Sequence, residues 1–290
     1  MDTPTKIPHT FIVAYHPKMP EAIPLSEEIA LFLQELGRKE SHGSLYDPEL
    51  RKQVEEGNFD LLIALGGDGT MLRAGHLSAP YGVPILGVNL GRFGFLTAVI
   101  REDWKHTLER VLAGDYWIEV RMMLRAEHCR GEKILGVWNV VNECFVGRGE
   151  IVRPVQLITE VDGAYLTTYV ADGLIVATPT GSTAYALAAG GPILPPELRN
   201  ILIVPVAPHF SVERAIVLHE GSEVSVSVKT EHEASLTIDG QSSIQLKDGD
   251  QVYVRISEHT LSFIRVQDRD YFYQNLTSRM NQNPTTGASR

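Results

Sequence analysis

Residues 61–70 of this chain read LLIALGGDGT. The five apolar residues that begin this stretch predict a strand buried on both faces. The glycines after them permit a tight turn, and a helix-like segment follows over 71–79. A strand, a glycine turn and a helix in this order bring backbone N–H groups and a helix N-terminus close to a phosphate. The stretch therefore predicts an α/β fold with a phosphate site.

A carboxylate, Asp68, stands in the middle of this turn. It would repel a bound phosphate, so it needs another role: holding a divalent metal, or removing a proton from a hydroxyl that attacks a phosphate. Arg73, one helical turn on, is within reach of a phosphate, although an exposed arginine without a ligand explains it equally well. The stretch is neither a P-loop nor a full dinucleotide fingerprint, because Leu72 stands where the third glycine should fall.

Length and composition limit the possible classes of protein. A chain of 290 residues holds one large domain or two ordinary ones, and its net charge of −10 argues against a nucleic-acid or anionic-membrane partner. Cys129 and Cys144 match no zinc spacing, so we expect two reduced thiols, with a disulfide between them left open. The N-terminus lacks the features of a secretion signal, and no run of about 18 apolar residues occurs. We therefore expect a cytoplasmic protein.

Strands and helices alternate through the first 115 residues. We expect strands at 10–15, 61–65 and 84–89, and helices at 26–36, at 71–79 and after a capping Asp103. Unbroken apolar strands between helices predict a parallel sheet covered on both faces. Residues 1–115 are therefore predicted to form a Rossmann-like α/β domain.

The pattern changes near residue 116, where apolar and polar residues begin to alternate. Strands are expected at 116–127, 134–141, 155–161, 165–170, 173–177, 201–206, 223–228, 234–238, 251–256 and 261–265, with one helix at 182–189. Glycine-containing turns between them predict a β-rich domain over 116–268, either sandwich-like or a complex sheet. Residues 269–290 are expected to pack back through the aromatic run at 271–273 and to be disordered from Asn281.

A second strand–turn–helix unit begins at Asp172. A short apolar strand runs from there into the segment TPTGSTAY at 178–185. Ser182 and Thr183 can cap the next helix or donate hydrogen bonds to a ligand oxygen. The small residues that follow leave room for a flat group. Together these features favour a ligand site over an ordinary capped helix.

Two other segments carry groups that suit a ligand. The apolar residues 137–141 run directly into Asn142 and Glu143. An amide beside a carboxylate both donates and accepts hydrogen bonds, as a ribose or carboxamide requires. Taken alone, a strand that ends at the surface explains this dipeptide better. The glycine-rich loop 91–97 fits a structural turn as well as it fits the lining of a site.

In this order the motifs resemble those of the NAD kinases, the ATP- or polyphosphate-dependent enzymes that make NADP from NAD. The resemblance runs from about residue 61 to about residue 245. It rests on GGDGT at 66–70, GVNLGRFGFLT at 87–97, NE at 142–143, the segment 172–185 and GGPI at 190–193. The GGDG loop alone also occurs in diacylglycerol and sphingosine kinases and, loosely, in phosphofructokinases. The TPTGSTAY segment is far more specific.

The resemblance implies a homodimer or homotetramer that binds NAD, a phosphate donor and Mg²⁺. It implies that Asp68 is the general base on the 2′-hydroxyl of the adenosine ribose, and it leaves the metal ligands open. Together, the residues and the resemblance predict contacts with NAD or the nucleotide from Gly67, Gly69, Arg73, Asn142, Glu143, Arg153, Asp172, Ser182, Thr183, Ala184, Tyr185, Ala186, Leu187, Ala188 and Gln241.

Two other functions stay open. A lipid or sugar kinase with the same glycine loop would not use NAD, and the segment 178–185 counts against it. A non-catalytic sensor of NAD(H) or NADP(H) would bind dinucleotide without turnover, and Asp68 counts against it because a sensor needs no base. The sequence leaves undecided the donor, the preference between NAD and NADH, and feedback by NADP(H).

Overall fold

The computed structural model describes residues 6–91, 94–151, 153–209, 212–241 and 243–281. Arg92 and Phe93 of the expected glycine loop lie outside these ranges, as do residues 282–290 of the expected disordered tail. In the part of the chain that the structure describes, no helix is long and apolar enough to span a membrane.

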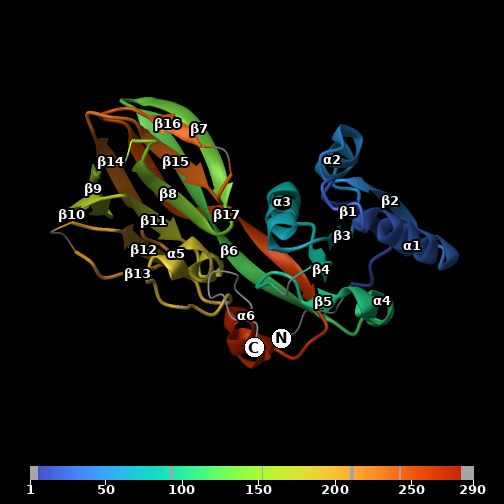
Figure 1. The fold of residues 1–290 in the computed structure, drawn as a ribbon. Coiled ribbons are helices and arrows are strands. Elements are labelled where there is room, and N and C mark those ends of the chain that lie inside the picture. The colour runs from blue at the N-terminus through green and yellow to red at the C-terminus, as the bar shows by residue number, and fades with distance from the viewer. Residues whose placement is uncertain (1–5, 92–93, 152, 210–211, 242, 282–290) are drawn as a thin grey trace. The chain divides into compact units, whose positions relative to one another are not determined.

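Contacts divide the chain into two compact units, which are described in turn (Figure 1). The first unit comprises residues up to Val120 and from Leu261 onward, and the second runs from Arg121 to Thr260. One strand, β17 (Gln251–Arg265), contributes to both. The expected limits of 1–115, 116–268 and 269–290 stay a prediction.

The first unit is an α/β domain with a parallel sheet. Its strands β1 (Thr10–Tyr15), β2 (Lys39–Ser44), β3 (Leu61–Leu65) and β4 (Ile85–Asn89) lie in the order β2-β1-β3-β4, with the short β5 (Val99–Ile100) and the end of β17 against β4. The helices are α1 (Ala22–Glu35), α2 (Pro48–Glu55), α3 (Asp68–Ser78), α4 (Trp104–Leu112) and α6 (Tyr271–Asn281), with 3-10 turns at Ala79–Tyr81 and Arg101–Asp103.

Burial explains which elements of this unit were predictable. Every residue of β3 and β4 is buried, as their unbroken apolar sequences predict. Apolar residues of β1, β3 and β4 form one core cluster with α1 and α4. By contrast, β2 was not expected, because none of its six mostly polar residues is buried and backbone pairing with β1 holds it.

The helix after the glycine turn begins earlier than predicted. Gly67 is the N-cap of α3, so Asp68 is the first residue of the helix, whereas the expected start was Met71. The expected capping by Asp103 is wrong in one respect: the residue occupies the N-cap position of α4, but its side chain makes no capping hydrogen bond.

The second unit is a sandwich of two antiparallel sheets. One sheet contains β10 (Ala164–Ala171), β9 (Val155–Val161), β14 (Val224–Lys229) and β17 in that order, with β6 (Trp117–Arg130) paired to β17 and to β7 (Lys133–Val140). The other has the order β13 (Ile216–His219), β12 (Asn200–Val206), β11 (Gly173–Ala177), β8 (Glu143–Arg148), β15 (Ala234–Ile238) and β16 (Ile244–Leu246). Apolar residues of both sheets share one core cluster, so the sheets pack face to face.

Several expected elements of the C-terminal half differ from the observed ones. The strands expected at 251–256 and 261–265 are one continuous strand, β17. The expected helix at 182–189 is a 3-10 turn (Thr180–Thr183) followed by the short α5 (Tyr185–Ala188). The N-cap of α5 is Ala184, so the expected capping by Ser182 and Thr183 is wrong. Asn281 ends α6, where the disordered tail was expected to begin.

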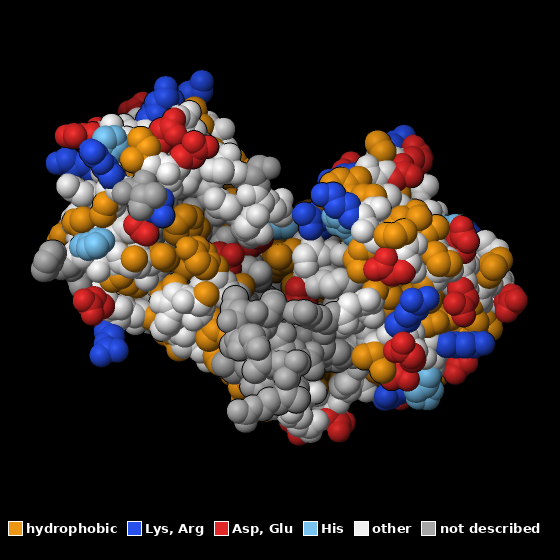
Figure 2. All heavy atoms as spheres, in the orientation of Figure 1, with side chains coloured by type: hydrophobic (Ala, Val, Ile, Leu, Met, Phe, Trp, Pro, Cys, Tyr) orange, Lys and Arg blue, Asp and Glu red, His pale blue; other side chains and the backbone are white. Residues whose placement is uncertain are grey.

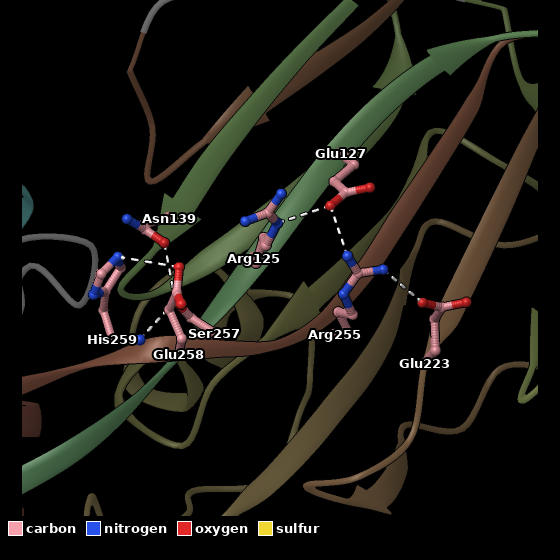
Figure 3. Close-up of polar contacts among 8 residues, drawn as sticks. All are labelled: Arg125, Glu127, Asn139, Glu223, Arg255, Ser257, Glu258 and His259. Carbon is pink, nitrogen blue, oxygen red and sulfur yellow. Dashed lines mark hydrogen bonds and ion pairs between the residues drawn. The ribbon is translucent and has the colours of Figure 1, made fainter. Parts of the chain in front are cut away.

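Charge pairs link neighbouring strands of the second unit. Figure 3 shows Arg255 of β17 between Glu127 of β6, at 2.7 Å, and Glu223, at 3.0 Å. Ser257 donates a hydrogen bond to Asn139 of β7 at 2.9 Å. Opposite charges on adjacent strands favour one register, although a partly exposed pair adds at most about 1 kcal/mol.

The surface carries charges of both signs. On the face drawn in Figure 2, Lys and Arg side chains are interspersed with Asp and Glu and do not gather into one continuous basic patch. This view is consistent with the expectation of no nucleic-acid partner, which stays a prediction.

Candidate active site

The glycine turn of the first unit places Asp68 at the start of a helix. Gly66 has φ +151°, and a Cβ there would lie 2.2 Å from Thr70 Oγ1, so the close approach requires glycine. The half-buried Gly67 and the exposed Gly69 flank the carboxylate. The eleven residues of α3 start here, so the positive end of its dipole lies at the turn.

The glycine-rich loop at 91–97 holds the Asp68 carboxylate. One carboxylate oxygen accepts the N–H of Phe95 at 2.8 Å, and the other accepts the N–H of Leu96 at 3.0 Å. A Cβ on Gly94 would lie 2.0–2.5 Å from the carboxylate atoms of Asp68, so this close contact also requires glycine. The loop therefore contacts the candidate catalytic residue, and its role in lining a ligand site stays a prediction.

Positive groups lie near this helix start. The exposed Arg73 donates to the Gly69 carbonyl at 2.9 Å. Burial lowers the pKa of His16, and the charges of Arg73 and Lys18 lower it further. The Arg73 guanidinium at this helix start suits an anionic ligand such as a phosphate.

In the second unit, Asp239 organises the start of β8. Its carboxylate accepts the N–H groups of Val141 at 2.9 Å, Asn142 at 2.7 Å and Glu143 at 2.9 Å. Asp239 follows β15 and has φ +50°. Nothing local in the sequence shows that this carboxylate faces a segment almost a hundred residues away.

The side chain of Glu143 is buried, with 6% of the residue exposed. Burial and the charge of Asp239 raise its pKa to about 8, although a hydrogen bond from the Tyr185 backbone opposes the shift. Among the described residues, its Oε2 has no hydrogen-bond partner. An unpartnered buried carboxyl with a strongly raised pKa is typical of a ligand-binding or catalytic group.

The TPTGSTAY segment packs against this dipeptide. Thr178 donates its hydroxyl to the Val141 carbonyl at 2.6 Å and accepts the N–H of Gly181 at 3.0 Å. A Cβ on Gly181 would lie 2.1 Å from the Asn142 carbonyl oxygen, so two backbones meet here. The partly exposed Tyr185 ring lies 5.5 Å from the ring of Phe145. Thr178 is not among the predicted site residues, yet its hydrogen bonds join the 178–185 segment to Val141 and Asn142.

Some predicted contact residues have internal partners. The Ser182 hydroxyl accepts the N–H of Leu194 at 2.9 Å and is fully buried, and the Thr183 hydroxyl donates to the Thr180 carbonyl at 3.2 Å. Ala186 is also fully buried. Of the other predicted residues here, Ala184 and Leu187 are half-buried and Ala188 is exposed.

Other predicted residues lie elsewhere in the second unit. Asp172 precedes the far end of β11, where Gly173 is opposite Gly147, whereas Ala177 is opposite Glu143. Four residues of strand span about 13 Å, so Asp172 is not beside Glu143; it forms an ion pair with Arg148 at 3.2 Å.

Two further predicted contact residues, Gln241 and Arg153, are exposed on the second unit. Gln241 is exposed on the turn that carries Asp239, and its N–H binds the Ile238 carbonyl at 2.9 Å. Arg153 is exposed and contacts His232 at 3.1 Å. A contact of either residue with a ligand stays a prediction.

The described residues do not build a metal centre of their own. Within residues 6–281, leaving aside the undescribed positions, no group of three His, Cys, Asp or Glu side chains could hold a metal ion. Both oxygens of Asp68 already accept backbone N–H groups.

Comparison with known proteins identifies the family. Residues 38–116 match the ATP-NAD kinase N-terminal domain, and residues 141–266 match the ATP-NAD kinase C-terminal domain. The chain is 39% identical over 269 residues to a NAD kinase of Chloroflexus aurantiacus, covering 92% of this chain and 97% of the relative. The chain belongs to the NAD kinase family. A NAD kinase of Dehalococcoides mccartyi is 38% identical over 273 residues, covering 93% of this chain and 95% of that one.

Solved structures of the family share the fold. A NAD kinase from Archaeoglobus fulgidus, solved in complex with ATP, has a TM-score of 0.74 and 27% identity, covering 94% of this chain and 99% of that one. Yeast NADH kinase complexed with NADH has a TM-score of 0.80 at 24% identity, covering 98% and 90%, which establishes the fold alone. The family membership makes this protein a kinase that acts on NAD, so the lipid-kinase, sugar-kinase and sensor alternatives fall away.

Proposed function

We propose that this enzyme transfers the terminal phosphoryl group of ATP to the 2′-hydroxyl of the adenosine ribose of NAD, giving NADP. The observation that carries the proposal is the Asp68 carboxylate, which two backbone N–H groups hold at the N-terminus of a helix. A carboxylate fixed in this way suits proton removal from a hydroxyl, and the helix start beside it suits phosphate.

The proposed reaction is a direct displacement. The ribose oxygen bonds to the terminal phosphorus of ATP, the bond from that phosphorus to the ADP oxygen breaks, and Asp68 takes the hydroxyl proton. A positioned base of this kind contributes roughly 10²–10⁴-fold to the rate. The amides of Gly67 and Gly69 and the guanidinium of Arg73 would bind the donor phosphates.

The second unit would recognise the dinucleotide. Asn142 supplies an amide, and Glu143, with a pKa of about 8, supplies a carboxyl that both donates and accepts at neutral pH. The partly exposed ring of Tyr185 offers a stacking surface for a flat base. Thr183, Ala184, Leu187, Ala188 and Gln241 would complete the contacts, while Ser182 and Ala186 support the segment from inside. Asp172 and Arg153, which lie away from Glu143, would contact other parts of the bound nucleotide.

Magnesium would come with the donor. Mg²⁺ commonly binds through substrate phosphates and waters with only one or two protein carboxylates, which fits a chain whose described residues form no metal cluster. When bound, the ion would neutralise phosphate charge. A cytoplasmic location and a homodimer or homotetramer stay predictions from the sequence.

The test is NADP formation by the purified protein with NAD, ATP and Mg²⁺, beside Asp68→Asn. We expect the variant to lose most turnover while its affinity for NAD, measured by calorimetry, changes little. Near wild-type turnover in Asp68→Asn would show that the base is another group. A parallel assay with polyphosphate identifies the donor: product with polyphosphate alone would overturn ATP as the phosphoryl source.

A further inference from the structure

Leu96 is held from two sides within the first unit. Its N–H donates to Asp68 at 3.0 Å, and its carbonyl accepts the Nη2 group of Arg265 at 3.2 Å. One peptide segment therefore joins the candidate base to the end of β17. A movement of Arg265 would be passed to the N–H group that orients the Asp68 carboxylate.

Arg265 belongs to a buried polar cluster with Glu119 and Tyr271. Arg265 and Glu119 are each 1% exposed, and Nε of the arginine donates to the carboxylate at 2.5 Å. The Tyr271 hydroxyl, on α6, donates to the same carboxylate oxygen at 2.7 Å. The Arg265 guanidinium also lies over the rings of Phe263, at 4.6 Å, and Tyr271, at 5.2 Å. These contacts fix both the position and the plane of the guanidinium.

A second anchor holds the same loop two residues further on. The Gln267 side chain donates to the Ala98 carbonyl at 2.7 Å, and the Gln267 carbonyl accepts the Trp117 indole N–H at 2.7 Å. Phe272 of α6 also lies against Phe95, with 6.5 Å between the ring centroids. The C-terminal segment therefore supports the loop at several points.

We propose that Glu119, Arg265 and Tyr271 are positioning residues that set the orientation of the Asp68 carboxylate through the backbone of Leu96. This inference rests on the proposed role of Asp68 as the base. It gives the end of β17 and α6, which lie about two hundred residues beyond the glycine turn in the sequence, a part in catalysis without contact to substrate.

Stability alone is a weak explanation for this cluster. Removing two charges from water is costly, and packed apolar residues often replace a buried ion pair without loss of stability. The cluster also does what apolar residues cannot, because the arginine carries one directed donor to Glu119 and another to the loop. A lysine at this position keeps the charge but has no rigid fork to hold both partners.

The test compares Arg265→Lys with Arg255→Lys. Arg255 lies ten residues earlier on the same strand and also joins two partners, Glu127 and Glu223, but it belongs to the second unit. Tyr271→Phe is the milder variant, and its control is Tyr116→Phe, which removes a hydroxyl that donates to the Lys6 carbonyl in the same unit. Two quantities are measured for each: steady-state kcat and KM for NAD, and the hydrogen-exchange rates of the amides at 95 and 96 in the free enzyme.

We expect Arg265→Lys to lower kcat by about tenfold or more, with KM for NAD within about twofold of wild type. Exchange at the two amides should quicken by about tenfold. Tyr271→Phe should shift both quantities in the same direction by less, and the two controls should leave both near wild type. Unchanged exchange in Arg265→Lys, or equal effects in Arg255→Lys, would overturn the proposal. Should Arg265→Lys not fold, Tyr271→Phe against Tyr116→Phe decides by the same criteria.

The exchange measurement uses no substrate, so it separates two failures. If exchange is faster in Arg265→Lys but Asp68→Asn keeps its turnover, the cluster holds the loop and Asp68 is not the base. If exchange is unchanged in Arg265→Lys but Asp68→Asn is inactive, Asp68 is the base and Glu119, Arg265 and Tyr271 do not position it.

Discussion

The carboxylate of Asp239 accepts the backbone N–H of Glu143 at 2.9 Å, and its negative charge adds to burial in raising the pKa of the Glu143 side chain. Two further N–H groups, from Val141 and Asn142, bind the same carboxylate. Asp239 therefore accepts three backbone N–H groups, while Glu143 has a buried Oε2 without a partner among the described residues. The pair makes the start of β8 a prepared polar site.

The raised pKa of Glu143 has a consequence for stability. With a pKa of about 8 in the folded protein and about 4.3 in the unfolded chain, the folded state holds a proton that the unfolded state has lost between these values. The contribution of Glu143 to the free energy of unfolding is therefore greatest at low pH. It falls as the pH rises from about 4 to about 8 and does not change above pH 8. The two pKa values set an upper limit of about 5 kcal/mol on this change.

Glu143→Gln tests this dependence, since glutamine stays neutral at every pH. We expect the melting temperature of wild type to fall relative to that of Glu143→Gln as pH is raised from 5 to 8. Calorimetric scans of both proteins at half-unit pH intervals measure the difference. A difference that does not vary over this range would contradict the raised pKa.

Gly94→Ala should impair turnover without unfolding the protein. Its new methyl group would lie 2.0–2.5 Å from the Asp68 carboxylate, so either the carboxylate or the loop must move. A displaced base costs about a hundredfold in kcat. The matched control is Gly91→Ala in the same loop, where a Cβ has no neighbour within 4 Å. Equal kcat values for the two variants would show that the contact does not matter for catalysis.

Asp60 is expected to govern part of the acid stability of the first unit. Burial acts to raise its pKa, but hydrogen bonds from the Lys6 side chain, the His9 backbone and both donors of Thr10 outweigh it and lower the pKa to about 2. The stability from this group is present above about pH 4 and is lost as pH falls through 2. Its size is about 2 kcal/mol.

Denaturant unfolding of wild type and Asp60→Asn at pH 6 and pH 2.5 measures this contribution. The variant should be less stable at pH 6, and the gap should narrow at pH 2.5. A gap of the same size at both values would mean that the ionised form of Asp60 gains nothing from its donors.

The sequence predicted those parts of the fold and site that depend on local pattern. The apolar runs of β3 and β11 end where expected because burial of every residue leaves a clear signal. The polar edge strand β2 has no such signal. Partners distant in sequence were also missed: Asp239 beneath Asn142, and Arg265 behind Leu96. Their side chains act on backbone groups, and such contacts depend on tertiary packing that no motif records.

Gly181→Ala should weaken binding of the dinucleotide. Its Cβ would meet the Asn142 carbonyl at 2.1 Å, and backbone atoms on both sides leave little room to adjust. The 178–185 segment would then separate from Asn142 and Glu143. We therefore expect KM for NAD to rise by about tenfold or more, and this change to be larger than the fall in kcat. Steady-state kinetics with Gly91→Ala as the control checks this. An unchanged KM would show that the contact between Gly181 and Asn142 is not part of the NAD site.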